Sequence, residues 1–180
     1  MRSADKVSGH RDGLEVRLAS IYEAEEIALC LALAFEPYQP HYTAGAFADT
    51  VPTADGIRRR MEQMKVYVAI ASDGVLAGTL AAQLVGDEGH LRGMAVRPRF
   101  QGHSVAQRLL VTAERDLAAS GARCITLDTT ALLERAARFY LKNGYVRSGR
   151  VTDFFGMPLY EYLKELPRAP GSKPGYLFIR

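Results

Sequence analysis

The sequence predicts a mixed α/β fold in which a mostly antiparallel sheet is flanked by helices. Short apolar or alternating segments are joined by turns such as Ser72-Asp73-Gly74, which is typical of β-hairpins. Other segments carry apolar residues at helical spacing. In the middle of the chain, a strand that ends near Val96 leads through a glycine-containing loop into a helix that begins near Val105. This order of strands and helices is typical of a mixed α/β domain.

Length and composition fit one globular domain with a full-sized core, since the chain has 180 residues, of which 48% are hydrophobic and 24% charged. A net charge of +3 is too weakly basic to indicate a nucleic-acid partner. No apolar run is long enough to span a membrane, and residues 1–13 lack the apolar core of a signal peptide, so we expect a cytoplasmic protein without a membrane partner. Cys30 and Cys124 lie far apart in apolar surroundings, which favours buried thiols over a disulfide.

The first third of the chain predicts a strand followed by helices. Residues 14–18 alternate as a strand does, and Ser20 and Glu23 have the spacing of a capping box that starts a helix. The segment 35–47 is rich in proline and aromatic residues. Two interpretations of it stay open: a loop that walls a substrate pocket, or a loop that packs its own aromatic rings on the core. Helical spacing returns over residues 55–64.

The rest of the chain predicts a hairpin, a strand that enters the glycine loop, and further strands and helices in alternation. Gly121 and Gly144 are placed to end the two helices. The expected strands cover residues 65–71, 75–85, 90–96, 124–130, 145–151 and 159–166, and the expected helices cover residues 105–120 and 132–143.

The loop between the strand and the long helix carries a specific pattern, V-R-P-R-F-Q-G-H-S-V-A-Q-R-L-L from Val96 to Leu110. Pro98 ends the strand, and the free N–H groups of a helix start suit an anion. The pattern resembles the acetyl-CoA loop of the GNAT superfamily of N-acetyltransferases. The resemblance covers residues 14–166, so we expect a GNAT-like domain there, a flexible tail over 1–13 and a C-terminal extension over 167–180.

The resemblance implies how acetyl-CoA would bind. Its pyrophosphate would lie on the loop, and its pantetheine arm would pair with the backbone of the preceding strand, where one N–H would also stabilise the oxyanion on the thioester carbonyl. No metal is expected, because no metal-ligand cluster appears. The implied cofactor-binding residues are Met94, Ala95, Val96, Gln101, Gly102, His103, Ser104, Val105 and Ala106.

Two positions depart from the pattern of the family. Ser104 stands where relatives usually have glycine, and two hypotheses follow. Its hydroxyl binds a phosphate oxygen, or Ser104 and Gln107 form a capping box that occupies a backbone N–H otherwise free for pyrophosphate. Leu133 stands where many relatives have an asparagine that contacts CoA, so this chain lacks that side chain.

A second motif, A-A-R-F-Y-L-K-N-G-Y from Ala136 to Tyr145, resembles the late helix of the same family. The resemblance implies that Tyr140 is the acid that protonates the departing CoA thiolate. A phenol suits this role because it donates a proton and is neutral at physiological pH. The structural alternative is a tyrosine that packs in the core.

Strand alternation supplies candidates for the base that deprotonates an amine. It places Glu88, His90, Arg92 and Met94 on one face. Glu88 and His90 are therefore candidate catalytic bases, acting directly or through a water, and the alternative for each is an exposed turn residue.

The resemblance implies an N-acetyltransferase that moves acetyl from acetyl-CoA to a primary amine by direct attack in a ternary complex. We expect a small-molecule amine, since nothing suggests a long peptide groove. The alternatives are a protein or peptide acetyltransferase, a member that acts on charged tRNA, and a non-catalytic acyl-CoA-binding module. A homodimer is the default expectation for such domains.

Overall fold

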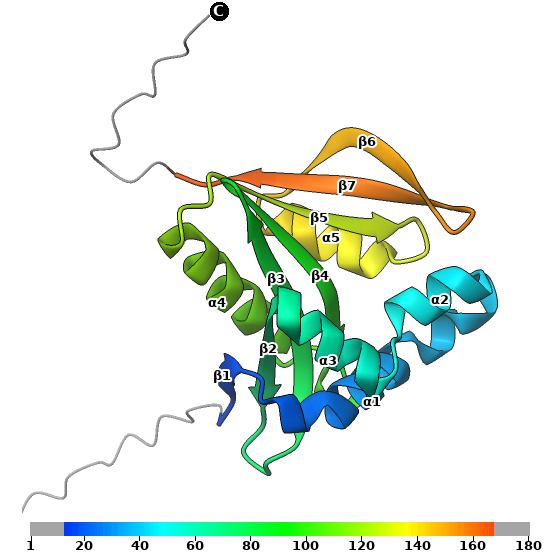
Figure 1. Cartoon of the computed structure of the whole chain (residues 1–180), viewed down its shortest axis with the longest axis vertical. Helices are drawn as coiled ribbons and strands as arrows, with labels where there is room; N and C mark the ends of the chain where they lie inside the picture. Colours follow the sequence, from blue (N-terminus) through cyan, green and yellow to red (C-terminus); the bar gives the residue numbers. More distant parts are fainter. Residues whose placement is uncertain (1–12, 168–180) are drawn as a thin grey trace, which may run out of the picture.

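The computed structural model describes residues 13–167, so most of the expected N-terminal tail and C-terminal extension lie outside the described residues. It contains one seven-stranded sheet in the order β1-β2-β3-β4-β5-β7-β6 (Figure 1). β4 and β5 are parallel, and every other neighbouring pair is antiparallel. The expected mixed α/β fold with a mostly antiparallel sheet is confirmed.

The helices and strands follow the predicted order, with one additional helix over residues 44–50 that the sequence did not predict. The strands are β1 (Glu15–Leu18), β2 (Lys65–Ile70), β3 (Leu76–Val85), β4 (Glu88–Val96), β5 (Cys124–Thr130), β6 (Val146–Phe154) and β7 (Met157–Glu165). The helices are α1 (Ala24–Phe35), α2 (Ala44–Thr50), α3 (Ala54–Gln63), α4 (Val105–Ala119) and α5 (Glu134–Lys142). None of the helices within residues 13–167 is long and apolar enough to cross a membrane.

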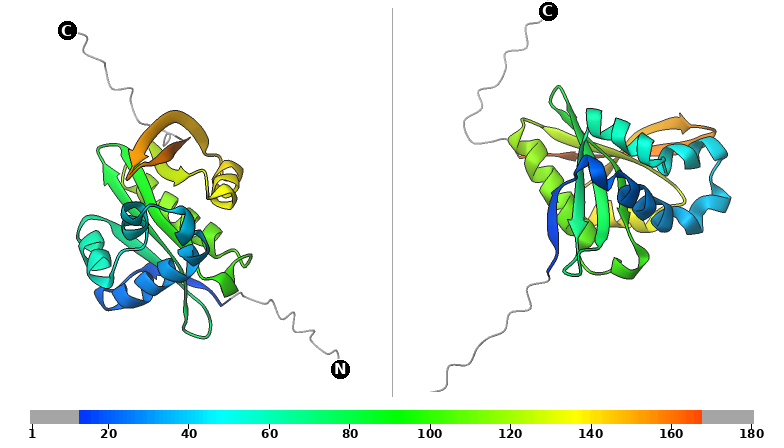
Figure 2. Two further views of the ribbon diagram at one scale, coloured as in Figure 1. Left: turned by 90° about the vertical axis from the view of Figure 1, so that its right-hand side faces the viewer. Right: turned by 60° about the horizontal axis from the view of Figure 1, so that its bottom comes forward.

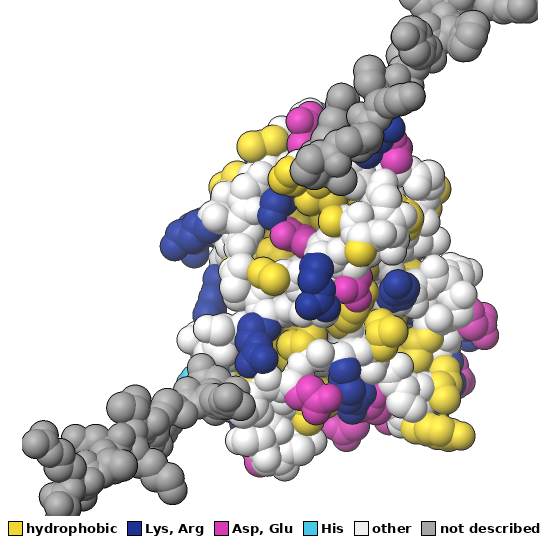
Figure 3. Space-filling view, turned by 90° about the vertical axis from the view of Figure 1, so that its left-hand side faces the viewer, with side chains coloured by type: hydrophobic (Ala, Val, Ile, Leu, Met, Phe, Trp, Pro, Cys, Tyr) yellow, Lys and Arg dark blue, Asp and Glu magenta, His cyan; other side chains and the backbone are white. Residues whose placement is uncertain are grey.

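Helices cover both faces of the sheet (Figure 2). One core lies between the sheet and α4 and α5, and contains Leu109, Leu127 and Tyr140. The other lies between the sheet and α1 and α3, and contains Ile27 and Ile57. Because each helix buries one apolar stripe, its polar side chains remain outside. On the face that Figure 3 shows, Lys and Arg side chains are interspersed with Asp and Glu rather than gathered into one basic patch.

The segment 35–47 is more regular than a loop. A 3₁₀ turn over Glu36–His41 is followed by α2, whose start is capped by the Thr43 hydroxyl. The sequence does not predict this helix, because the segment contains Gly45 and glycine is a poor helix former. The structure requires a small residue there, since a Cβ at Gly45 would lie 2.7 Å from the Phe155 ring. Ser20 and Glu23 form the expected capping box, although it opens a 3₁₀ turn ahead of α1. Cys30 and Cys124 are both free thiols, as expected, but only Cys30 is buried, whereas Cys124 is partly exposed.

β4 and β5 separate halfway along their length. Their pairing runs from Glu88 and Cys124 to Leu91 and Leu127 and then stops, although both strands continue. Beyond Arg92, β4 contains a bulge, because Gly93 and Met94 lie opposite one residue of β3, Leu80. Gly93, in the bulge, has a φ of +63°, which favours glycine. The two strands diverge from this point (Figure 1), and the candidate site lies where they part.

Candidate active site

A cleft of about 350 Å³ opens between the end of β4, the loop that leads into α4, and α5; we call it the loop cleft. The predicted cofactor-binding residues that line it are Met94, Ala95, Val96, Gln101, Gly102, Ser104, Val105 and Ala106. His103 is exposed and is not among its lining residues, and its Nδ1 lies 3.1 Å from the Gln101 carbonyl oxygen. The structure therefore brings together all of these predicted residues except His103.

The start of α4 presents free hydrogen-bond donors to the loop cleft. The first backbone N–H of the helix with a partner is that of Arg108, which donates to the Ser104 carbonyl at 3.0 Å. Among residues 13–167, the N–H groups of Val105, Ala106 and Gln107 have no backbone or side-chain acceptor. Free N–H groups and the positive end of the helix dipole both favour an anion at this position.

Ser104 does not form the capping box that was one of its two predicted roles. It is the N-cap residue of α4, but its side chain makes no capping hydrogen bond. Its φ of 59° and ψ of 8° are left-handed, whereas a capping serine normally has extended backbone angles. The side chain of its expected partner Gln107 donates instead to Asn143 at 2.8 Å. The left-handed backbone explains why glycine suits this position, and phosphate binding by the hydroxyl stays a prediction.

Arg135 is a cleft residue that sequence reasoning missed. It lies in the first turn of α5, and its Nη1 donates to Gln101 Oε1 at 2.8 Å. The amide nitrogen of Gln101 donates in turn to the Val96 carbonyl at 3.3 Å. The loop is thereby tied to α5 on one side and to β4 on the other, with a guanidinium beside the free N–H groups.

A second cleft, of about 360 Å³, opens on the other side of the gap between β4 and β5; we call it the polar cleft. Its walls come from the ends of β4 and β5, from α2 and α3, and from the β6–β7 hairpin. Its charged and titratable lining residues are Asp49, Arg60, His90, Arg92 and Asp128, together with Tyr42 and Tyr140. Within residues 13–167, no cluster of side chains suits a metal ion.

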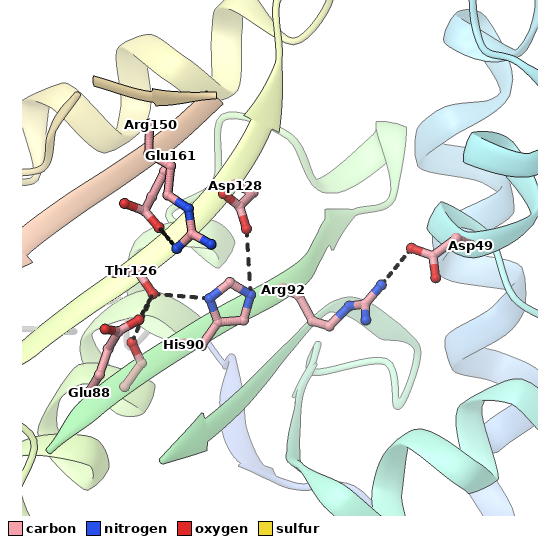
Figure 4. Close-up of polar contacts among 9 residues, drawn as sticks. Asp49, Glu88, His90, Arg92, Thr126, Asp128, Arg150 and Glu161 are labelled. Atoms are coloured by element: carbon pink, nitrogen blue, oxygen red, sulfur yellow. Dashed lines mark hydrogen bonds and ion pairs between the residues drawn. The ribbon is translucent and has the colours of Figure 1, made fainter. Parts of the chain in front are cut away.

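A chain of hydrogen bonds fixes the His90 ring (Figure 4). The Thr126 hydroxyl donates to Glu88 Oε1 at 2.8 Å, and its oxygen lies 3.0 Å from His90 Nδ1. Because a hydroxyl has one proton, Thr126 accepts from His90, and Nδ1 must carry the hydrogen. The other ring nitrogen, Nε2, is then the basic one, and it lies 3.9 Å from Asp128 Oδ2.

The surroundings of His90 favour its neutral form. Burial lowers the pKa of His90 below its ordinary value, and Arg92 lowers it further, whereas Asp128 opposes this shift. Burial also raises the pKa of Asp128, and His90 opposes that shift. Glu88 is not among the lining residues of the polar cleft. Of the two candidate bases, His90 is therefore the one that a ligand in this cleft can contact. Glu88 is linked to His90 by hydrogen bonds through the Thr126 hydroxyl.

Tyr140 lies where the two clefts meet. It lines both of them, as do Phe35, Met94, Leu133 and Ala136. The side chain is 7% exposed and stacks edge-on against Tyr145, with ring centroids 5.6 Å apart. Burial raises the pKa of Tyr140 above its ordinary value, so the phenol stays protonated. Leu133 contributes an apolar side chain to this junction.

Some residues in and around the polar cleft can be predicted from the sequence, and others cannot. Thr126 and Asp128 alternate along β5, so they share a face with the residues of β4 that were identified by alternation. Asp49 and Arg60 come from α2 and α3, and only the packing of these helices against β4 brings them to the cleft. No local pattern predicts such an approach.

Replacing Ser104 by glycine should stabilise the protein. A left-handed backbone costs a residue with a Cβ about 1–2 kcal/mol, which glycine avoids, and no capping hydrogen bond is lost. After the entropy cost of glycine, we expect Ser104→Gly to raise the free energy of unfolding by up to about 1 kcal/mol in urea titrations. Ser104→Ala, the control, keeps the backbone strain and should not stabilise. A loss of stability in Ser104→Gly would contradict this account.

Comparison with known proteins supports the architecture. Among solved structures, the PaiA N-acetyltransferase from Thermoplasma acidophilum in complex with coenzyme A superposes with a TM-score of 0.71 at 18% identity, over 85% of this chain and 99% of that one. The ribosomal-protein-S18-alanine N-acetyltransferase from Escherichia coli gives a TM-score of 0.72 at 15% identity, over 91% and 99%. The IAA acetyltransferase from Bacillus cereus gives 0.64 at 15% identity, over 85% and 99%.

These likenesses show that the fold is the GNAT fold expected from the loop and helix motifs. A search of curated proteins finds no match to this chain. The sequence model of the Acetyltransferase (GNAT) family matches residues 27–145, which include the loop cleft, β4, β5 and Tyr140. The chain belongs to the GNAT acetyltransferase family.

Proposed function

We propose that this chain transfers an acetyl group from acetyl-CoA to the primary amine of a small molecule, with both substrates bound at once. The observation that carries the proposal is that two clefts of different character meet at Tyr140. The loop cleft lies at the free N–H groups of α4, and the polar cleft is lined by His90 and Asp128. Direct transfer requires two binding sites that share a reaction point, and the junction at Tyr140 supports the proposal because a ligand in either cleft could reach it.

The residues of the loop cleft fit acetyl-CoA. The free N–H groups at the start of α4 and the guanidinium of Arg135 suit its pyrophosphate. Met94, Val96 and Phe139 provide an apolar wall for its pantetheine arm. Beyond the bulge, no strand within residues 13–167 pairs with β4 on the β5 side, so its backbone groups are open to an amide chain. When bound, acetyl-CoA supplies an acyl group activated as a thioester.

The polar cleft fits the amine. His90 Nε2 and Asp128 Oδ2 lie 3.9 Å apart, and both are acceptors when His90 is neutral. An ammonium nitrogen about 2.9 Å from each fits between them. Asp128 would hold the positive charge while His90 takes the proton, which leaves the amine nucleophilic. The hydrogen bond from Nδ1–H to Thr126, and from Thr126 to Glu88, would stabilise the imidazolium that forms.

The function is tested by incubating the protein with acetyl-CoA and a panel of primary amines, and by measuring the free thiol released. We expect release of CoA with at least one small amine, and mass spectrometry should detect the acetylated form of that amine. Binding of acetyl-CoA without release for any amine or peptide would indicate a non-catalytic acyl-CoA-binding module instead.

A protein acceptor is the second candidate. It is favoured by the structural likeness to the ribosomal-protein-S18-alanine N-acetyltransferase. Peptides with an N-terminal alanine therefore belong in the same panel. If they react at least about tenfold faster than every small amine, the acceptor is a protein or peptide.

Tyr140→Phe should lower kcat by at least about tenfold while acetyl-CoA affinity stays unchanged. The substitution removes only the hydroxyl that would protonate the departing thiolate, and acid catalysis typically contributes about 10²–10⁴-fold. Stopped-assay rates and calorimetry measure the two quantities. The control is Tyr145→Phe, which removes a neighbouring buried hydroxyl that donates to Glu114 at 2.9 Å and should affect stability rather than kcat. An unchanged kcat in Tyr140→Phe would make Tyr140 a packing residue.

The kcat of the wild-type protein should fall as the pH is lowered, because the base acts only when it is neutral. Burial and Arg92 lower the pKa of His90 against the opposing charges of Asp128, Glu88 and Glu161. The midpoint of the acidic limb in kcat/KM, which reports the free enzyme, should therefore lie below the ordinary pKa of histidine. His90→Gln should remove this acidic limb and lower kcat by about 10²–10⁴-fold.

The positioning role of Thr126 has its own control. Thr126→Val breaks the hydrogen-bond chain and should lower kcat, whereas Thr126→Ser keeps the hydroxyl and should retain most of the wild-type kcat.

An acidic limb that persists unchanged in His90→Gln would assign the base to another group.

A further inference from the structure

Arg60 is a cation of the polar cleft that the proposed reaction does not use. It lies near the end of α3, is half-buried, and lines the cleft beside the bulge of β4. A Cβ at Gly93 would lie only 2.7 Å from Arg60 Nη1, so the guanidinium rests directly on the glycine of the bulge. The same residue that bends β4 therefore makes room for this charge.

The hydrogen bonds of Arg60 are largely unmade. A guanidinium has five N–H donors, and among residues 13–167 Arg60 uses one of them, from Nη2 to the Asp49 carbonyl oxygen at 3.4 Å. No carboxylate of the described residues lies within 4.0 Å of it, whereas Arg92 pairs with Asp49 at 2.6 Å and Arg97 pairs with Glu26 at 2.6 Å. Burial lowers the pKa of Arg60 to about 10, so it remains charged at neutral pH. A half-buried cation without a partner is costly unless a ligand supplies one.

The two walls of the polar cleft carry opposite charge. The wall formed by α2, α3 and the β4 bulge holds Arg60 and the Arg92–Asp49 pair, for a net charge of +1. The wall formed by β5 holds Asp128 beside the neutral His90. Figure 4 shows Asp49 and Arg92 on one side of His90 and Asp128 on another. A ligand that matches this arrangement has a cationic amine and an anionic group.

We infer that the acceptor is an amine that also carries a carboxylate, such as an amino acid. Its ammonium group lies between His90 and Asp128, and its carboxylate accepts hydrogen bonds from the Arg60 guanidinium. The inference rests on the proposed function and names its substrate class. A carboxylate fits better than a phosphate, because Arg60 is the one cleft cation without a carboxylate partner among residues 13–167, and Arg92 is already held by Asp49. The planar fork of arginine also matches a carboxylate in a bidentate arrangement.

The test compares amines in pairs that differ only in the carboxylate. The pairs are the proteinogenic amino acids, β-alanine and 4-aminobutyrate, each beside its carboxamide, and phosphoethanolamine is included as the phosphate-bearing amine. For the wild-type protein, kcat/KM should be at least tenfold higher for the carboxylate member of the reactive pair. Arg60→Gln should bring this ratio close to one, because the substitution should lower kcat/KM for the carboxylate member and leave kcat/KM for the carboxamide unchanged. Arg59→Gln, at an exposed position of the same helix, should leave the ratio unchanged.

A binding measurement separates recognition from catalysis. In calorimetry, the N-acetylated product of the preferred amino acid should bind Arg60→Gln at least tenfold more weakly than the wild-type protein, with Arg60→Lys in between. Acetyl-CoA should bind all of these variants equally, which also confirms that they are folded.

The outcomes are distinct. If no amine releases CoA, the proposed function fails. If amines react but the carboxamides are equal or better substrates, or if Arg60→Gln keeps the preference, the carboxylate assignment is wrong while the function stands. A preference for phosphoethanolamine over every carboxylate amine also overturns it.

Discussion

Two parallel strands remain paired only while their backbones keep a common register, and β4 and β5 lose it after Leu91 and Leu127. The bulge of β4 that follows Arg92 depends on Gly93, whose φ of +63° a residue with a Cβ adopts only with strain. The meeting of the two clefts follows from this divergence. The gap exposes backbone of β4 toward α5, and it lets the loop cleft and the polar cleft meet inside the domain.

The two clefts divide the chemistry by physical character. The loop cleft combines apolar side chains with the free N–H groups of α4, which suits a long ligand with an anionic end. The polar cleft places His90, Asp128, Arg60 and the Arg92–Asp49 pair in a small volume. Tyr140 closes the junction as a buried neutral phenol. The hydrogen-bond chain from Glu88 through Thr126 adds direction, because it leaves one ring nitrogen of His90 basic and turns it toward Asp128.

The sequence predicts the fold order and the loop cleft well, because both are encoded locally. The proline, glycine and helix start between Val96 and Leu110 lie within one segment, and the predicted residues other than His103 meet in the cleft as expected. Ser104 is an exception, since the serine-to-glutamine spacing suggests a cap while the backbone is left-handed. A side-chain pattern does not report a positive φ.

The polar cleft is less predictable, because its walls come from segments far apart in the chain. Alternation identifies His90 but does not separate it from Glu88, and only the position of Thr126 on the neighbouring strand assigns their different roles. Arg60 is one of three consecutive arginines, and nothing in the sequence distinguishes it from Arg58 and Arg59. Only the packing of α3 against the bulge of β4 distinguishes Arg60, and that contact forms only in the folded structure.

The claim that both substrates meet in one complex is tested most directly by initial rates, with acetyl-CoA and a reactive amine varied together. Intact-protein mass spectrometry after incubation with acetyl-CoA alone accompanies the rates. The account predicts double-reciprocal lines that intersect and a protein whose mass is unchanged. Parallel lines together with an acetylated protein would show that the acetyl group passes through the enzyme, and would contradict direct transfer at the junction of the two clefts.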